Sequence, residues 1–150
     1  MSGCENSPRP MTIAVEFDGT IVSHAYPEIG RDLGAVAVLK ALQARGHRLI
    51  LLTMRCRLNQ FTTGDAQGLV DAPAGDYLAD AVRWCRDRGL TFWAVNNNPE
   101  QSRWTTSRKV YADLYIDDAA LGIPLLQAGE SRPFVDWEAV EHILKTRGIL

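Results

Sequence analysis

An apolar run near the start of the chain ends in two carboxylates that are separated by one residue. The run reads Ile-Ala-Val over residues 13–15, and Glu16, Phe17 and Asp18 follow it, ahead of a Gly-Thr turn. Because residues i and i+2 of a strand project to the same face, we expect Glu16 and Asp18 to point to one spot at the carboxyl end of a buried strand. Two carboxylates at one spot either repel each other or share a cation.

A second acidic pair follows another apolar strand farther along the chain. Asp117 and Asp118 come directly after the predicted strand 113–116. With Glu16 and Asp18 they would bring up to four negative charges into one crevice, and without a counter-ion some of these groups would hold protons. Mg²⁺ resolves this repulsion, because it prefers oxygen ligands and takes one or two carboxylates, waters and a substrate phosphate. We therefore predict Mg²⁺ as the cofactor, with Glu16, Asp18, Asp117 and Asp118 as candidate ligands.

Further polar residues near the ends of the predicted strands are suited to binding phosphate. Thr53 follows the predicted strand 49–52 and can donate a hydrogen bond to a phosphate oxygen. Lys109 can reach over the sheet edge as a point charge, and Arg55 can add a bidentate phosphate contact. Asn96 is another candidate for substrate binding, although a run of three asparagines is also typical of a turn. Acids, Mg²⁺, a hydroxyl and a lysine are the parts that phosphoryl transfer needs.

Strands alternate with helices along the chain, which predicts a parallel sheet. The apolar runs predict strands at 12–17, 49–52, 91–95, 113–116 and, more briefly, 133–135. Periodicity and caps predict helices at about 36–45, at about 77–88 after Asp76, after Asp136, and over a short stretch from about Ser107 to Val110. Ligands of such sheets bind beyond the carboxyl ends of the strands, where the candidate residues gather. We predict an α/β fold, a three-layer sandwich with a doubly wound parallel sheet and no large cap domain.

Length and composition indicate one domain of ordinary size. We expect residues 11–150 to form it, after a disordered tail over residues 1–10 that lacks the apolar segment of a signal peptide. The net charge of −2 argues against a nucleic-acid partner, and no apolar stretch approaches the ~20 residues that span a membrane. Cys4, Cys56 and Cys85 are odd in number and lack metal-site spacing, which favours a reduced, cytoplasmic protein. A homo-oligomer is compatible with the small caps, since a second subunit can close an open crevice.

In this order and context, the candidate residues resemble the haloacid dehalogenase (HAD) superfamily of phosphohydrolases. The first motif, Asp-x-Asp-Gly-Thr after a strand, matches residues 16–20 except at its first position, where Glu16 stands. The second motif matches residues 49–53, the third-motif lysine matches Lys109, and the fourth motif matches residues 115–118. Three further segments are similar to a small capless bacterial subgroup: residues 26–30, the Thr53-x-Arg55 step and residues 94–96. The resemblance covers roughly residues 12–120 and implies the HAD-like core without a large cap.

The resemblance implies catalytic roles for the matching positions. The carboxylate at position 16 would attack phosphorus and form an acyl-phosphate. Asp18 would protonate the leaving group and then activate water. Thr53 and Lys109 would hold the phosphoryl oxygens.

The resemblance also implies how the metal would be held. Asp117 would bind Mg²⁺ together with the carboxylate at position 16 and the backbone carbonyl of Asp18, and Asp118 would assist. Outside the motifs, His24 lies in the loop after the first acidic pair and can line the crevice, although most loop histidines have no site role.

The departure from the motif at Glu16 bears on catalysis more than on metal binding. Glutamate keeps the charge, but its extra methylene moves the carboxylate outward by on the order of 1.5 Å, and a misplacement of ~1 Å can cost ~100-fold in rate. We therefore keep two functions open. One is an Mg²⁺-dependent phosphohydrolase that acts on a phosphate monoester, a phosphorylated small molecule, and is impaired by Glu16. The alternative is an Mg²⁺-binding pseudo-phosphatase that recognises a phosphoryl ligand or partner.

A response-regulator receiver domain is a third, weaker alternative. It also uses acids, Mg²⁺, a threonine and a lysine on a parallel sheet. It carries its adjacent acidic pair early and its lysine last, whereas here the pair Asp117-Asp118 follows Lys109. The order of the residues therefore favours the HAD reading.

Overall fold

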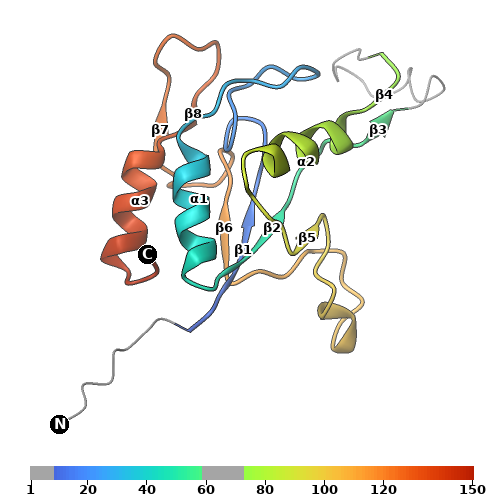
Figure 1. The fold of residues 1–150 in the computed structure, drawn as a ribbon, viewed down its shortest axis with the longest axis vertical. Helices are drawn as coiled ribbons and strands as arrows, with labels where there is room; N and C mark the ends of the chain where they lie inside the picture. The colour runs from blue at the N-terminus through green and yellow to red at the C-terminus, as the bar shows by residue number, and fades with distance from the viewer. Residues whose placement is uncertain (1–8, 59–72) are drawn as a thin grey trace.

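The computed structural model describes residues 9–58 and 73–150 and builds the domain on a four-stranded parallel sheet (Figure 1). The strands are β1 Thr12–Val15, β2 Arg48–Leu51, β5 Ala94–Val95 and β6 Leu114–Ile116, in the order β5-β2-β1-β6. Val15 of β1 lies opposite Leu51 of β2 on one side and Ile116 of β6 on the other. The chain steps outward from β1 to β2 and β5, and then returns to the far side of β1 for β6. That reversal creates a switch point between β1 and β6, where doubly wound sheets bind their ligands.

In the described part of the chain, three α-helices pack into the main hydrophobic core on one face of this sheet: α1 Ala35–Ala44, α2 Tyr77–Asp87 and α3 Trp137–Thr146. Two of them begin at the predicted caps. The Asp76 carboxylate accepts a hydrogen bond from the amide of Ala79 at 3.0 Å, and the Asp136 carboxylate accepts from the amides of Glu138 and Ala139 at 3.1 Å. These acids satisfy amides that the first turn of a helix leaves unpaired, so the two starts are encoded locally.

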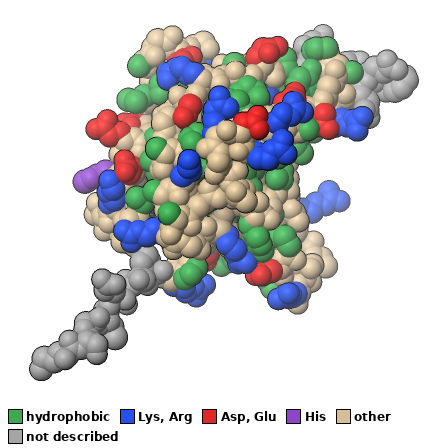
Figure 2. All heavy atoms as spheres, viewed as in Figure 1, with side chains coloured by type: hydrophobic (Ala, Val, Ile, Leu, Met, Phe, Trp, Pro, Cys, Tyr) green, Lys and Arg blue, Asp and Glu red, His purple; other side chains and the backbone are tan. Residues whose placement is uncertain are grey.

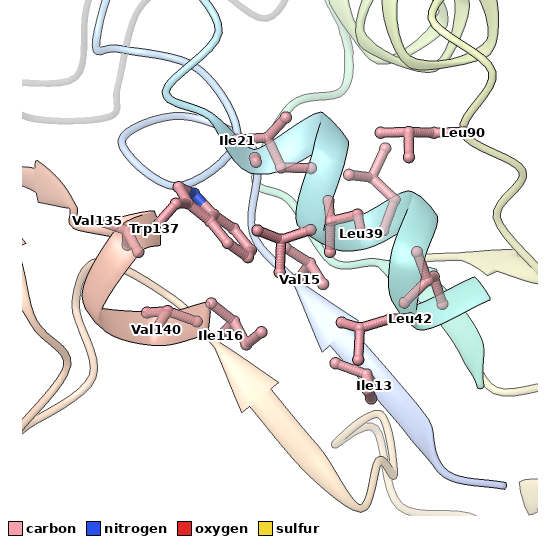
Figure 3. Close-up of a cluster of buried hydrophobic side chains, with 14 of the residues drawn as sticks. Ile13, Val15, Ile21, Leu39, Leu42, Leu90, Ile116, Val135, Trp137 and Val140 are labelled. Atoms are coloured by element: carbon pink, nitrogen blue, oxygen red, sulfur yellow. The ribbon is translucent and has the colours of Figure 1, made fainter. Parts of the chain in front are cut away.

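The main core fills the space between the sheet and the helices. Ile13 and Val15 of β1 face the helices, whereas Ala14 faces the opposite way, as the alternation of a strand requires. Figure 3 shows Trp137 and Val140 of α3 beside Ile116 of β6. Each large side chain buried in this way stabilises the fold by about 1.5–3 kcal/mol relative to exposure.

The opposite face of the sheet is covered by an irregular segment. Ala14 and Ile50 pack there with Ala112, and the 3₁₀ turn η1 Gln101–Arg103 belongs to the same stretch between β5 and β6. The short helix predicted at about 107–110 is wrong, because no helix is assigned there. The side-chain amide of the buried Gln101 makes hydrogen bonds to the backbone of this segment in place of helical bonds. It donates to the carbonyls of Ser107 and Lys109 at 2.8 and 2.9 Å, and it accepts from the amide of Tyr111.

The prediction of an α/β fold with a parallel sheet is confirmed, and the described residues include no large cap domain. The architecture is Rossmann-like, with helices on one face and the irregular segment on the other. Two small antiparallel pairs complete it: β3 Arg57–Leu58 with β4 Gly75–Asp76, and β7 Leu125–Leu126 with β8 Phe134–Val135. The strand predicted at 133–135 therefore exists, but it pairs outside the main sheet.

Some predictions fall on residues outside the described ranges. Residues 1–8 of the predicted tail and residues 59–72 between β3 and β4 are among them. Within the described part of the chain, no helix is both long and apolar enough to cross a bilayer. Figure 2 shows acidic and basic side chains interspersed on the face in view.

Candidate active site

The ends of β1 and β6 carry the first two acids of the site. The amide of Glu16 donates to the carbonyl of Ile116 at 3.0 Å, which extends the pairing of the two strands by one residue beyond Val15. Glu16 therefore leaves β1 at the level where Asp117 leaves β6. The adjacency predicted from the two apolar runs is a consequence of this register.

Glu16 is half-buried and interacts mainly with polar groups of the chain around it. Its Oε1 accepts from the Thr53 hydroxyl at 3.4 Å, and its carboxylate also accepts from the amide of Phe17. Burial raises its pKa from 4.5 to about 8, and the charges of Asp18, Asp117 and Asp118 add to the effect against the Phe17 bond. A carboxylate in these surroundings favours a bound cation or a proton.

Asp18 is held by a buried guanidinium. Arg55 Nε and Nη2 each donate to one of its carboxylate oxygens at 2.8 Å, in a bidentate pair. Arg55 is only 2% exposed, and it also donates to the backbone carbonyls of Pro27 at 3.1 Å and Glu28 at 2.6 Å. The fork of Arg55 is committed to Asp18 and to the loop of Pro27 and Glu28, so its predicted contact with phosphate stays a prediction.

Asn96 acts on Thr53 from the neighbouring strand. Its Oδ1 accepts from the amide of Thr53 at 2.8 Å, while its own amide donates to the carbonyl of Leu51 at 2.8 Å. Asn96 has a φ of 53°, a left-handed conformation that asparagine tolerates better than most residues. The predicted substrate contact is thus replaced by a positioning contact, because the side-chain oxygen is used to fix the backbone of Thr53. The Thr53 hydroxyl, which also accepts from the amide of Arg55 at 3.1 Å, remains beside Glu16.

Asp118 turns toward His24, which the motifs did not single out. His24 Nε2 lies 3.1 Å from Asp118 Oδ2, and the two side chains are 13% and 15% exposed. The amide of Asp118 donates to the Thr20 hydroxyl at 3.0 Å. Burial raises the pKa of Asp118, and His24 opposes that effect. The one sequence signal for this contact was the position of His24 in the loop after the first motif.

Lys109 lies near the Tyr115 ring. Its side chain is exposed, and its ammonium nitrogen is 5.7 Å from the centre of the Tyr115 ring. Within residues 9–58 and 73–150, no salt bridge joins Lys109 to any carboxylate. The sequence placed Lys109 in the site by its position before Asp117, but the irregular segment that carries it is held by Gln101 instead.

The four predicted metal ligands do not form one cluster. Among the described residues, no group of three or more His, Cys, Asp or Glu side chains is arranged to hold a metal ion. The reason is that Asp18 and Asp118 each face a basic partner. In the same part of the chain neither Glu16 nor Asp117 has a salt-bridge partner, so these two are the carboxylates left for a cation.

Comparisons with known proteins support the fold and identify one related protein, but they indicate no activity. No family model and no curated protein matches the chain. Among solved structures, the chain is similar to a conserved protein from Bacteroides thetaiotaomicron. The two share 39% sequence identity, the match covers 93% of each chain, and the TM-score is 0.66.

Proposed function

The chain belongs to the same family as the conserved Bacteroides thetaiotaomicron protein. From the geometry of the site in this chain, we propose that the chain is a HAD-type, Mg²⁺-dependent phosphohydrolase that acts on a phosphate monoester. One observation carries the proposal. Glu16 and Asp117 leave adjacent parallel strands at the switch point of the sheet, and neither has a salt-bridge partner in the described chain. The Thr53 hydroxyl lies beside Glu16 and could donate to a phosphoryl oxygen.

The donor set fits Mg²⁺. This ion needs only one or two protein carboxylates, because waters and a substrate phosphate complete its shell. Glu16 and Asp117 would hold it; burial is the main cause of the raised pKa of Glu16, and the charges of Asp18, Asp117 and Asp118 add to it, so a cation would favour the ionised form. When bound, Mg²⁺ supplies positive charge to the oxygens of the transferring phosphoryl group.

The chain's own residues supply orientation and proton transfer. The Arg55 fork fixes both oxygens of Asp18, and each oxygen keeps a lone pair that can take up a proton. Acid and base catalysis by Asp18 is the role that the HAD resemblance implies, and Arg55 would orient its carboxylate for that role. Asn96 fixes Thr53, so the hydroxyl is positioned before substrate arrives.

The alternative, an Mg²⁺-binding pseudo-phosphatase, is favoured by Glu16 itself. Its carboxylate is bonded to the amide of Phe17 and to Thr53. A nucleophile must reach phosphorus in line with the leaving group, and the extra methylene of glutamate changes that approach. Metal binding tolerates this displacement better than in-line attack does.

Phosphate release from a panel of phosphate monoesters, in Mg²⁺ and in EDTA, tests the proposal. We expect slow Mg²⁺-dependent release by the wild type, a gain of about 10- to 100-fold in Glu16→Asp, and loss of release in Asp117→Asn. Asp87→Asn, at an exposed position on α2, is the matched control and should behave as wild type.

Two outcomes contradict this function in different ways. If the wild type releases no phosphate while Glu16→Asp does, the enzyme function is wrong for this chain and the binding alternative takes its place. If Mg²⁺ changes neither phosphate release nor the urea midpoint of wild type and of Asp117→Asn, both functions fail.

We also propose that the protein is cytoplasmic and acts on a phosphorylated small molecule. Cys56 and Cys85 are both free, and burial raises the pKa of Cys85 to about 12. A buried thiol of that kind is inert, and free thiols persist in a reducing compartment. Oxidation state measured by thiol labelling of freshly lysed cells tests the compartment.

A further inference from the structure

The loop after β1 and the loop after β6 are joined by a side-chain contact that no motif explains. We propose that His24 is a positioning residue, which holds Asp118 and thereby fixes the spacing between Glu16 and Asp117. This inference rests on the proposed function, because the spacing matters for binding Mg²⁺.

The contact is built into a closely packed corner. His24 Nε2 lies 3.1 Å from Asp118 Oδ2, and both side chains are mostly buried. When Asp118 is ionised its carboxylate only accepts, so the tautomer with the proton on Nε2 makes this bond. A Cβ atom added to Gly19 would lie 2.2 Å from His24 Nε2 and 2.7 Å from Asp118 Oδ2. Only a glycine leaves room for this contact, and its φ of +79° is the conformation that glycine adopts without cost.

The turn beneath the contact is anchored on its other side. The Thr20 carbonyl accepts from the Trp137 indole at 2.6 Å, and the Gly19 carbonyl accepts from the amide of Val135 at 2.9 Å. The Thr20 hydroxyl accepts from the amide of Asp118. The turn is therefore a fixed platform, and His24 is the side chain that attaches the Asp118 carboxylate to it.

The same arrangement explains why two acids are left for the cation. Arg55 holds Asp18, and His24 holds Asp118. Removing the imidazole frees the Asp118 carboxylate to rotate and loosens the loop that carries Asp117. Hydrogen-bond partners of metal ligands typically contribute 10- to 100-fold to affinity. Because His24 acts through Asp118 rather than on a ligand, its loss is expected to weaken Mg²⁺ binding by about 10-fold, the lower end of that range.

Titration calorimetry with MgCl₂ on the full chain at one pH tests the inference. We expect His24→Ala to bind Mg²⁺ about 10-fold more weakly than wild type or worse. His24→Gln, whose Nε2 can also donate to Asp118, should recover most of the affinity. His142→Ala, at an exposed position on α3, is the matched control and should bind as wild type. Urea midpoints in EDTA identify any variant that has simply lost its fold.

The outcomes separate this inference from the proposed function. If His24→Ala binds Mg²⁺ as wild type does, the positioning role is wrong and the function stands. If His24→Gln is folded but as weak as His24→Ala, the hydrogen bond is not the cause and the role is also wrong. If the wild type binds no Mg²⁺, the proposed function fails and the inference falls with it.

Discussion

The pairing of Arg55 with Asp18 gives the sharpest test of how the site is held together. Arg55→Met removes a guanidinium that is 2% exposed, and with it the bidentate bonds to Asp18 and the bonds to the carbonyls of Pro27 and Glu28. Breaking a buried ion pair from one side costs about 3–5 kcal/mol, because a charge is left without its partner. Because the Asp18 side chain is 16% exposed, water can solvate its charge in part. We therefore expect Arg55→Met to lower the free energy of unfolding by about 3 kcal/mol.

A double-mutant cycle separates the charge pair from the loop contacts. Asp18→Asn alone leaves the guanidinium unpaired and should cost about 2–3 kcal/mol. The double variant has no stranded charge and loses mainly the bonds to the two loop carbonyls. Its cost should therefore fall short of the sum of the single costs by roughly 2 kcal/mol. The surface pair Arg83–Asp80, at 3.3 Å with side chains 59% and 44% exposed, is the control, and Arg83→Met should cost less than about 1 kcal/mol.

Urea unfolding followed by circular dichroism, in EDTA at neutral pH, measures these free energies. Since small domains are stable by about 5–15 kcal/mol, each single variant should still show a folded baseline. The reasoning is refuted if Arg55→Met costs no more than Arg83→Met. It is also refuted if the two site substitutions add within about 0.5 kcal/mol, because independent residues behave in that way.

Three further predictions use the same urea assay. Because burial, and then neighbouring charges, raise the pKa of Glu16 from 4.5 to about 8, the folded chain keeps a proton that the unfolded chain releases. Stability in EDTA should fall from about pH 5 to 8 by up to ~1.4 kcal/mol per pH unit, and Glu16→Gln should remove most of that slope, because the pKa of Asp118 is also raised and contributes the rest. Gly19→Ala should cost over ~2 kcal/mol, against about 1 kcal/mol for Gly46→Ala, since both glycines have positive φ but only Gly19 is crowded. Trp137→Phe should cost about 1–3 kcal/mol, because it leaves the Thr20 carbonyl unpaired.

Features of the fold that depend on neighbouring residues could be predicted from the sequence. The strands β1, β2 and β6 follow from apolar runs, and the helix starts at Asp76 and Asp136 follow from cap chemistry. The predicted strand 91–95 shortens to Ala94–Val95, because β5 is an edge strand that pairs with β2 alone. The cover of the second face could not be predicted, because it depends on where one glutamine amide, that of Gln101, finds its partners.

The location of the candidate site could be predicted from the sequence more accurately than the contacts between its side chains. Strand ends and motif order brought Glu16 and Asp117 together, because parallel strands end at one edge. The partners of Asp18 and Asp118 could not be predicted in the same way. Arg55 is 37 residues from Asp18, and His24 is 94 residues from Asp118. The pairing of a basic group with a particular acid depends on loop conformation, and motif spacing contains no information about loop conformation.

These pairings change what Glu16 has to do. With Asp18 and Asp118 already paired, Glu16 and Asp117 are the acids through which the site would attract a cation. The Glu16 carboxylate is already engaged by the Thr53 hydroxyl at 3.4 Å. Binding a metal requires only the charge at that place, whereas attack on phosphorus requires the reach and direction of a particular side chain. Glutamate at position 16, where the motif that the chain resembles has aspartate, would therefore separate two properties that the shorter residue would combine. Measuring Mg²⁺ affinity and phosphate release separately, in wild type and in Glu16→Asp, distinguishes metal binding from attack on phosphorus.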